Sequence, residues 1–282
     1  MNFPASPNPS RPSSDDHDLQ RDLTVTPLDT RNDAPAATST STVDKSAARV
    51  RSMFAAIAGR YDLLNHLLSL NIDQSWRDRA ARRLYDRLAD GPSGPILDCC
   101  TGTCDLALTF DRVARGQRPI VGIDFTPELL RLGAVKLKRR GRTERITLGQ
   151  GDALRLPFAS NTFAASMVAF GLRNVADTQG GIDELTRVVQ PGGVVAILEF
   201  SRPRGPVLGR AYLSFFRDIL PRIGQTIAPN THNAYGYLPQ SVLEFPDGPD
   251  MIALLERRGL TDVTAHPLTV GIATLYLGVK PR

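Results

Sequence analysis

The chain has 282 residues, of which 41% are hydrophobic, with a formal net charge of +5 and a pI near 9.4. This composition supports a folded core, and no apolar run reaches the ~20 residues of a membrane-spanning helix. The first residues lack the pattern of a secretory signal, and their acidic side chains are untypical of a mitochondrial presequence. We therefore expect a cytoplasmic protein.

Residues 1–43 are predicted to form a disordered tail. They hold six prolines, many serines and threonines, and a single aromatic residue, Phe3. A segment with so little apolar surface cannot offset the entropy cost of ordering. The tail carries a net charge of −3, which leaves +8 on residues 44–282, predicted to be one domain.

Helices are predicted before the first strand, over residues 45–90, as an N-terminal helical preface. Apolar side chains recur at helical spacing in Val50, Met53, Phe54 and Ile57. The leucines of residues 63–68 give a second apolar face. A third helix is predicted from Trp76 to the glycine at position 91.

Strand and helix patterns alternate after position 94. Predicted strands cover residues 95–100, 119–124, 145–152, 163–170 and 194–200, with helices at 104–114, from 127 and at 181–189. Thr126 is the predicted N-cap of the second helix, and residues 191–193 (Pro-Gly-Gly) are predicted to stop the third. After an insert at 203–248 come a helix and two strands, predicted to form an antiparallel hairpin. The pattern indicates an α/β, Rossmann-like fold with a mostly parallel seven-stranded sheet.

Acidic residues follow three successive strands, at Asp98, Asp124 and Asp152. In such sheets, ligands bind beyond the carboxyl ends of the strands. The first turn has one glycine, Gly102, and lacks the G-x-G-x-x-G pattern, which argues against an NAD-dependent oxidoreductase. A cofactor with a positive amine and no phosphate, such as S-adenosylmethionine (SAM), suits the turn. Asp98 can place the amino end, Gly102 allows close backbone approach, Asp124 can accept from the ribose hydroxyls, and Asp152 can accept from the adenine amine.

The three cysteines, Cys99, Cys100 and Cys104, lie within six positions and do not form a disulfide framework. No histidine is near them in sequence, so we expect no metal site. Packing is the default role for Cys99 and Cys100. Cys104 lies near a helix N-terminus, which lowers the pKa of a thiol, and a reactive thiol there stays open.

Several motifs are similar to those of one enzyme family. They include residues 61–65 (YDLLN), 122–125 (GIDF), 170–175 (FGLRNV) and 235–241 (YGYLPQS). Over residues 50–280 the chain resembles the ubiquinone/menaquinone biosynthesis C-methyltransferase family of class I SAM-dependent methyltransferases. The resemblance implies methyl transfer from SAM to a ring carbon of a lipid-soluble, polyprenylated quinol. It leaves open the menaquinone or the ubiquinone series.

The resemblance also implies roles for individual residues. Those implied to contact SAM are Thr103, Asp124, Asp152 and Ala153. Arg173 is expected to stabilise the phenolate that forms on the quinol, with an internal salt bridge as the alternative. Asn174 is expected to orient a water molecule or the ring oxygen. Tyr61 and Asp105 are catalytic-pocket candidates, and packing is the alternative for Tyr61.

Two positions depart from the family pattern. Cys104 stands where glycine or alanine is usual, and its small side chain is expected to allow SAM binding. Tyr276 stands where histidine is often found, which leaves open any role of that position.

The expected partners follow from charge and from the insert. Basic clusters occur at residues 77–83 and 136–140, and the insert has an apolar face at residues 212–220. Together they indicate peripheral contact with the inner face of the membrane. An RNA or protein methyltransferase is the second enzyme hypothesis, and residues 169–172 lack the proline motif of enzymes that methylate base amines. A purely SAM-binding protein is disfavoured by Arg173, Asn174 and Tyr61. A homo-oligomer stays open.

Overall fold

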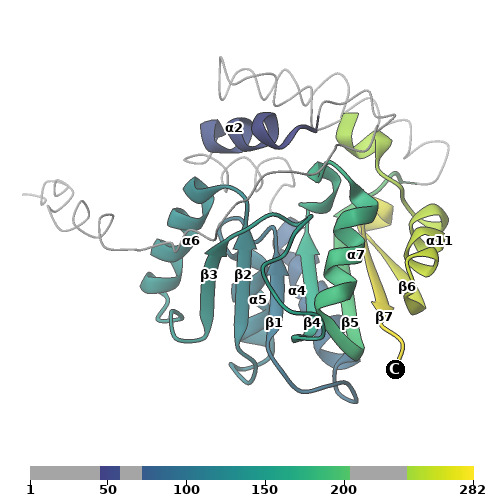
Figure 1. Ribbon diagram of the computed structural model, residues 1–282, viewed down its shortest axis with the longest axis horizontal. Helices are drawn as coiled ribbons and strands as arrows, with labels where there is room; N and C mark the ends of the chain where they lie inside the picture. Colours follow the sequence, from purple (N-terminus) through teal and green to yellow (C-terminus); the bar gives the residue numbers. More distant parts are fainter. Residues whose placement is uncertain (1–44, 58–71, 204–239) are drawn as a thin grey trace, which may run out of the picture.

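The computed structural model describes residues 45–57, 72–203 and 240–282. Within these ranges the strands form one sheet in the order β3-β2-β1-β4-β5-β7-β6 (Figure 1). The strands are β1 (Ile96–Cys99), β2 (Ile120–Asp124), β3 (Ile146–Gln150), β4 (Phe163–Ala169), β5 (Val189–Phe200), β6 (Thr261–Leu268) and β7 (Ala273–Val279). The helices are α2 (Ala47–Ile57), α4 (Ile72–Arg87), α5 (Asp105–Val113), α6 (Pro127–Arg139), α7 (Thr178–Val188) and α11 (Pro249–Arg257), with short 3-10 turns η2 (Leu172–Asn174) and η4 (Thr269–Gly271).

The strand directions confirm the predicted sheet. Strands β1 to β5 pair in parallel, whereas β7 lies antiparallel between β5 and β6. Because β1 occupies the centre with β2 on one side and β4 on the other, the chain reverses its winding direction there. A reversal of this kind opens a crevice at the carboxyl edge of the sheet.

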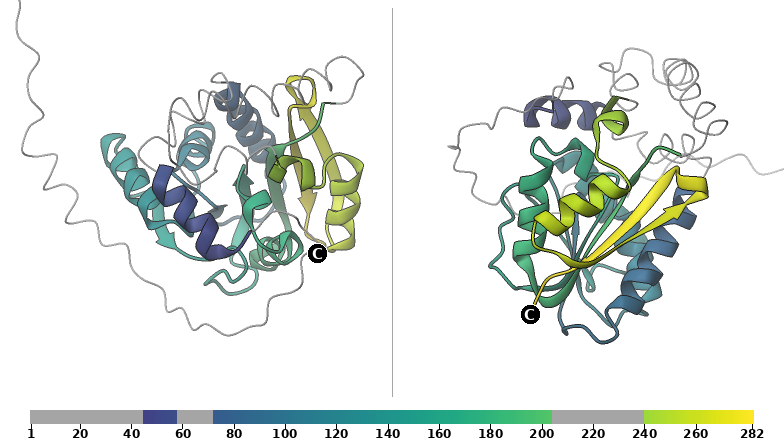
Figure 2. Two further views of the ribbon diagram at one scale, coloured as in Figure 1. Left: turned by 90° about the horizontal axis from the view of Figure 1, so that it is seen from above. Right: turned by 90° about the vertical axis from the view of Figure 1, so that its right-hand side faces the viewer.

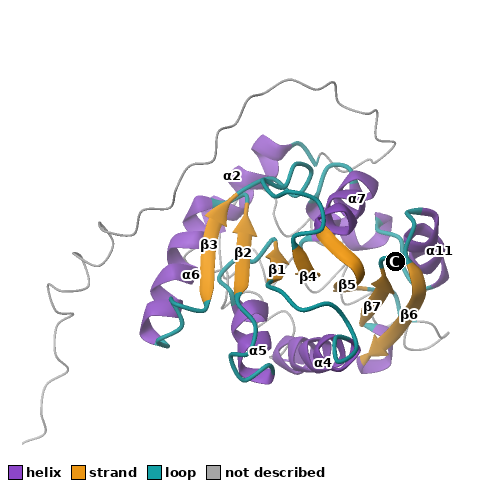
Figure 3. Ribbon diagram, turned by 60° about the horizontal axis from the view of Figure 1, so that its bottom comes forward, coloured by secondary structure: helices purple, strands orange, loops and turns teal. Residues whose placement is uncertain are grey.

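Helices cover both faces of the sheet. One apolar core joins α4, α5 and α6 to one face, and a second joins α7 and α11 to the other. Figure 3 shows α4 and α5 on the side of the sheet opposite α7. Helix α2 lies across the end of the strands rather than on a face, as the views in Figure 2 show. The α2 end of the molecule therefore roofs the crevice.

Two boundary predictions were wrong. Helix α4 begins at Ile72, before the predicted start at Trp76. Helix α7 ends at Val188 and β5 follows at once, so residues 191–193 lie inside a strand rather than after a helix. A Cβ on Gly193 would come within 2.4 Å of the Ala164 carbonyl oxygen, and the β4–β5 register shifts at this place. The glycine is thus needed for close strand approach at a bulge.

Several predictions concern residues outside the described ranges. They are the disorder predicted for residues 1–43, the apolar faces predicted for residues 63–68 and 212–220, and the pocket role predicted for Tyr61. The predicted helix over residues 50–57 is confirmed by α2. The N-cap position of Thr126 is confirmed by its extended backbone before Pro127, although its side chain makes no capping hydrogen bond.

Candidate active site

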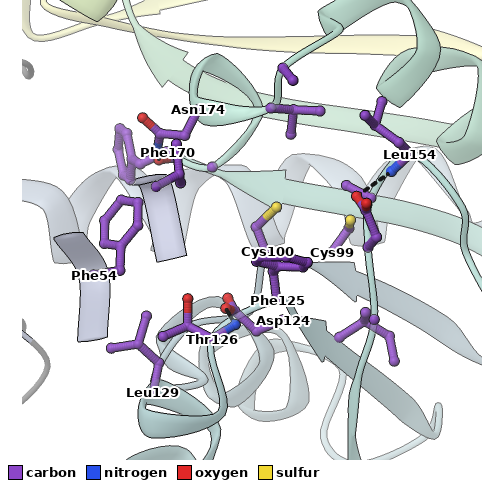
Figure 4. A pocket seen from close by; sticks show the side chains of 18 of the residues that line it. Phe54, Cys99, Cys100, Asp124, Phe125, Thr126, Leu129, Leu154, Phe170 and Asn174 are labelled. Atoms are coloured by element: carbon purple, nitrogen blue, oxygen red, sulfur yellow. Dashed lines mark hydrogen bonds between the residues drawn. The ribbon is translucent and has the colours of Figure 1, made fainter. Parts of the chain in front are cut away.

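A cleft opens at the carboxyl ends of β1, β2 and β4, beneath α2. It encloses about 800 Å³, counting the part open to solvent, within the usual size of a small-molecule site. Figure 4 shows side chains from these three strand ends and from α2 gathered around it. One end holds Asp124 and Asp152, and the lining also includes the aromatic rings of Phe54 and Phe170.

Asp124 is the buried carboxylate of the cleft wall. One of its oxygens accepts a hydrogen bond from the Gly102 backbone N–H at 2.8 Å, and the other accepts from the Thr126 N–H at 2.8 Å. Gly102 has a φ of 56°, so a glycine suits this turn. Burial raises the pKa of Asp124, and the backbone N–H donors oppose this. The contacts fix the carboxylate, whose remaining lone pairs can accept hydrogen bonds from a ligand's hydroxyl groups.

Asp152 and Ala153 line the same cleft directly after β3. The Asp152 carboxylate accepts a hydrogen bond from the Leu154 N–H at 2.9 Å, drawn as the dashed line in Figure 4. This bond closes a tight turn and fixes the acid at the cleft. The fold therefore brings Asp124 and Asp152 together at the carboxyl edge of the sheet.

Asp98 lies behind the cleft wall. Its carboxylate accepts from the Thr101 hydroxyl at 2.6 Å and from the Ala107 N–H at 3.1 Å, so it ties the turn to the start of α5. Burial raises the pKa of Asp98 to about 7. The position suits a residue that holds the turn in place rather than one that touches a ligand.

Thr103 and Asp105 meet a common partner away from the described cleft lining. The Lys136 ammonium donates to the Thr103 hydroxyl at 3.0 Å and pairs with the Asp105 carboxylate at 2.7 Å. This pair of contacts joins the start of α5 to α6. The predicted roles of Thr103 in SAM contact and of Asp105 in the catalytic pocket stay predictions.

The cysteines divide between lining and packing. Cys99 and Cys100 line the cleft, whereas Cys104 is fully buried, and a Cβ on Gly133 would lie 2.6 Å from its sulfur. Burial raises the pKa of Cys104 to about 12, which argues against the reactive-thiol alternative. Among the described residues, no three His, Cys, Asp or Glu side chains are grouped to hold a metal ion.

Arg173 forms the internal salt bridge that was the alternative to a catalytic role. Its guanidinium donates to the Glu199 carboxylate at 2.9 Å and to the Phe170 carbonyl, and its backbone N–H donates to Glu199 at 3.2 Å. Both side chains are buried, and the Phe200 ring lies 5.1 Å from the guanidinium. The Arg173 Nε has no hydrogen-bond partner within the described structure. Arg173 is therefore held rigidly near the cleft rather than on its wall.

Asn174 presents an unsatisfied acceptor at the cleft. Its side-chain nitrogen donates to the Phe170 carbonyl at 3.3 Å, while its Oδ1 is buried and has no partner in the described part of the chain. A buried polar atom without a partner is costly. A ligand that donates a hydrogen bond, such as a ring hydroxyl, would satisfy it.

Sequence reasoning missed Glu199 and Lys45. Glu199 is the only acid in the apolar run of residues 194–200, and that placement is a signal for a buried partner of a cation. Lys45 precedes α2 and lines the cleft. Its sequence neighbourhood contains no motif that would have identified it.

The residues present fit SAM. A fixed, buried carboxylate at Asp124 suits ribose hydroxyls, the turn at Asp152 suits an adenine amine, and the apolar lining suits the flat adenine ring. The Asn174 acceptor and the Phe54 and Phe170 rings remain for a second, aromatic molecule.

The sequence is similar to those of quinone methyltransferases. A family model described as the ubiE/COQ5 methyltransferase family matches residues 42–280. The "Ubiquinone/menaquinone biosynthesis C-methyltransferase UbiE" of Geobacter sp. (strain M21) is 44% identical, over 82% of this chain and 96% of the relative. The "Demethylmenaquinone methyltransferase" of Deinococcus radiodurans is 42% identical, over 82% of this chain and 92% of the relative.

Solved structures share the fold at low sequence identity. A SAM-dependent methyltransferase from Thermotoga maritima matches with a TM-score of 0.54 and 15% identity, over 82% of this chain and 99% of the other. A phosphoethanolamine N-methyltransferase of Haemonchus contortus, solved with S-adenosylhomocysteine, matches with a TM-score of 0.52 and 14% identity, over 72% of this chain and 52% of the other. At such identity these likenesses show the fold alone.

Proposed function

This chain belongs to the ubiE/COQ5 methyltransferase family, and on that premise we propose that the cleft beneath α2 binds SAM at its Asp124 end and the quinol ring near Asn174. The protein is a SAM-dependent C-methyltransferase of respiratory quinone biosynthesis, and its substrate is a polyprenylated quinol. One observation supports this assignment of a cofactor end and a substrate end. The same cleft holds a fixed carboxylate at Asp124 and an unsatisfied hydrogen-bond acceptor at Asn174.

The cofactor end is held by the turns after β1, β2 and β3. SAM supplies an electrophilic sulfonium methyl group. Asp124 accepts hydrogen bonds from the ribose, and Asp152 and Ala153 border the adenine. Asp98 acts through the turn that it ties together, and this fixes the backbone of Gly102 and Thr103 beside the amino-acid end. A pre-ordered turn lowers the entropy cost of binding.

The substrate end favours a flat aromatic ring. The rings of Phe54 and Phe170 line this part of the cleft, and Asn174 Oδ1 accepts a hydrogen bond from a ring hydroxyl. Holding the ring carbon near the methyl group contributes several kcal/mol, of order 7–11 in well-oriented systems. The Arg173 guanidinium is held in place by Glu199, and its buried Nε–H, which has no partner in the described structure, is a fixed donor that favours the electron-rich, phenolate-like ring.

A transfer assay tests the assignment. Purified protein, labelled SAM and demethylmenaquinol under reducing conditions should place label in the quinone fraction. A parallel reaction with the ubiquinone precursor distinguishes the two series. Label that appears in added RNA instead of either quinone would overturn the assignment.

The enzyme collects its substrate at an anionic membrane surface. The exposed basic side chains of Lys138, Arg139 and Arg140 at the end of α6 support this, together with the lipid nature of the quinol. Among the described residues, no helix is both long enough and apolar enough to span a bilayer. Vesicles containing anionic lipid should sediment the protein at low salt, and protein that stays in the supernatant would refute docking.

A further inference from the structure

Lys45 is a half-buried amine that lines the cleft. It lies directly before α2 and borders the same space as Phe54, Phe170 and Asn174. Within the described structure it has no hydrogen-bond partner. A lysine ammonium has three donors, and leaving them unpaired while the side chain is partly buried is costly. The arrangement therefore leaves the amine available to a molecule in the cleft.

Lys45 lies toward the β5 side of the cleft. The charges that act on it are those of Glu244, Glu199 and Arg173, whereas Asp124 and Asp152 occupy the cofactor end. Arg51, on the same helix, lies over the Phe125 ring. Burial, the largest cause, lowers the pKa of Lys45, with Arg173 adding to the effect and the two glutamates opposing it. The balance increases the fraction of neutral amine near neutral pH.

The reaction needs a proton acceptor at this end. A quinol ring carbon becomes a strong nucleophile when a ring hydroxyl loses its proton. Asn174 accepts hydrogen bonds but does not take up a proton, and Arg173 is a permanent cation held by Glu199. The other titratable side chains that line the described cleft are Cys99, Cys100, Asp124 and Asp152. A hydrogen bond with Cys99, followed by burial, raises the pKa of the Cys100 thiol, and the two acids lie at the cofactor end.

We propose that the Lys45 amine is a catalytic residue that removes the proton from the quinol hydroxyl during methyl transfer. The inference rests on the proposed function. The O–H bond breaks as an N–H bond forms on Lys45, and the ring carbon then forms a bond to the methyl group while the carbon–sulfur bond breaks. Loss of the proton on that ring carbon and reprotonation of the oxygen restore the aromatic quinol. One proton is released overall, from the Lys45 ammonium to solvent.

Three variants distinguish the loss of a proton acceptor from the loss of a positive charge and from nonspecific effects of mutation. Lys45→Arg keeps the positive charge but does not act as a base near neutral pH, whereas Lys45→Met removes both. Arg257→Ala removes an exposed cation of α11, away from both the cleft lining and the basic cluster at the end of α6, and is the control. Both Lys45 variants should lower kcat by about 100-fold, with SAM affinity unchanged by calorimetry and the control at the wild-type rate. A rise in the Kd for SAM with unchanged kcat would overturn the proposal and assign Lys45 to the cofactor carboxylate.

A spectroscopic measurement tests Lys45 without turnover. A nitro-substituted naphthol, bound with S-adenosylhomocysteine at a pH below its own pKa, should show its phenolate band in the wild type and in Arg257→Ala. Lys45→Met should show the neutral form. A phenolate band that persists in Lys45→Met would refute the role of Lys45. A wild type that binds the naphthol as phenolate but methylates no quinol would refute the proposed substrate instead.

Discussion

The two halves of the sheet's carboxyl edge bury charge in opposite ways. After β1 and β2, the carboxylates of Asp98 and Asp124 contact N–H and hydroxyl donors and form no salt bridge within the described residues. After β4 and β5, Glu199 is paired directly with Arg173. The first half thus lacks a countercharge of its own and suits a ligand that brings hydroxyl groups and positive charge. The second half is neutralised internally and can face an apolar ring.

The largest expected effect comes from removing the carboxylate that pairs with Arg173. Glu199→Gln leaves the Arg173 cation buried and unpaired, so the free energy of unfolding should fall by about 3–5 kcal/mol. Urea unfolding measures the change, and Glu256→Gln, an exposed carboxylate on α11, is the control. Equal stability of Glu199→Gln and the control would show that the pair does not hold this half together.

The pH dependence of stability should show how much free energy it costs to bury the ionised carboxylate of Asp98. The pKa of Asp98 is raised to about 7, from an ordinary value of 3.8, so the folded state binds this proton more tightly than the unfolded state. Its contribution to stability is complete below pH ~4, declines as the pH rises towards ~7 and is absent above, a loss of up to about 4 kcal/mol at 1.36 kcal/mol per pKa unit.

Asp98→Asn should therefore flatten the pH dependence of stability over this interval. Urea unfolding at pH 5 and pH 8 measures the difference from the wild type, and Asp90→Asn, which changes an exposed carboxylate in the turn after α4, is the control. If the unfolding free energy of Asp98→Asn depends on pH as steeply as that of the wild type, Asp98 is not the group that causes this dependence.

An apolar replacement of the Arg173–Glu199 pair separates stability from catalysis. The double variant Arg173→Met with Glu199→Leu removes both charges together, so it should recover much of the stability that Glu199→Gln loses. SAM affinity should stay at the wild-type value, while kcat falls by about 100- to 1,000-fold because the fixed N–H donors of the Arg173 guanidinium are gone. Calorimetry and the transfer assay give both values. A double variant with wild-type kcat would make Arg173 purely structural.

Removing charge from the ligand-facing half should affect the cofactor alone. Asp124→Asn places an amide opposite the N–H groups of Gly102 and Thr126, so the Kd for SAM should rise by about 100-fold, or 2.8 kcal/mol. Asp152→Asn should have a smaller effect because Asp152 is only partly buried. Calorimetric titration measures both. A larger loss for Asp152→Asn would reverse the order of the two acids.

The sequence was sufficient for the sheet and for one half of the site. Alternating apolar strands and helices predict a parallel sheet, and acids directly after neighbouring strands must then meet at one edge, as Asp124 and Asp152 do. The buried pair was harder to foresee because Arg173 and Glu199 are 26 positions apart. Their contact depends on how the η2 turn folds back over the end of β5.

Other features depend on contacts that no local pattern encodes. The Pro-Gly-Gly sequence of residues 191–193 predicts the end of a helix. In the structure these residues lie in a strand bulge, because Gly193 approaches the Ala164 carbonyl closely. No motif surrounds Lys45 in the sequence, and its place in the cleft follows from α2 crossing the strand ends. The structure at such positions depends on long-range packing, whereas the spacing of apolar residues in the sequence is enough to predict the strands.

The position of β7 has a consequence for how the protein is made. The last strand in the sequence is inserted between β5 and β6, and Thr274 pairs with Glu199 across the β5–β7 ladder. While a ribosome is still synthesising the C-terminal segment, β5 lacks this neighbour, and the Arg173–Glu199 pair has no complete wall behind it. Domains fold as their segments emerge during synthesis, and pairing between distant segments comes late. The site therefore matures only after β7 has emerged and paired with β5, so nascent chains that lack β7 should remain inactive.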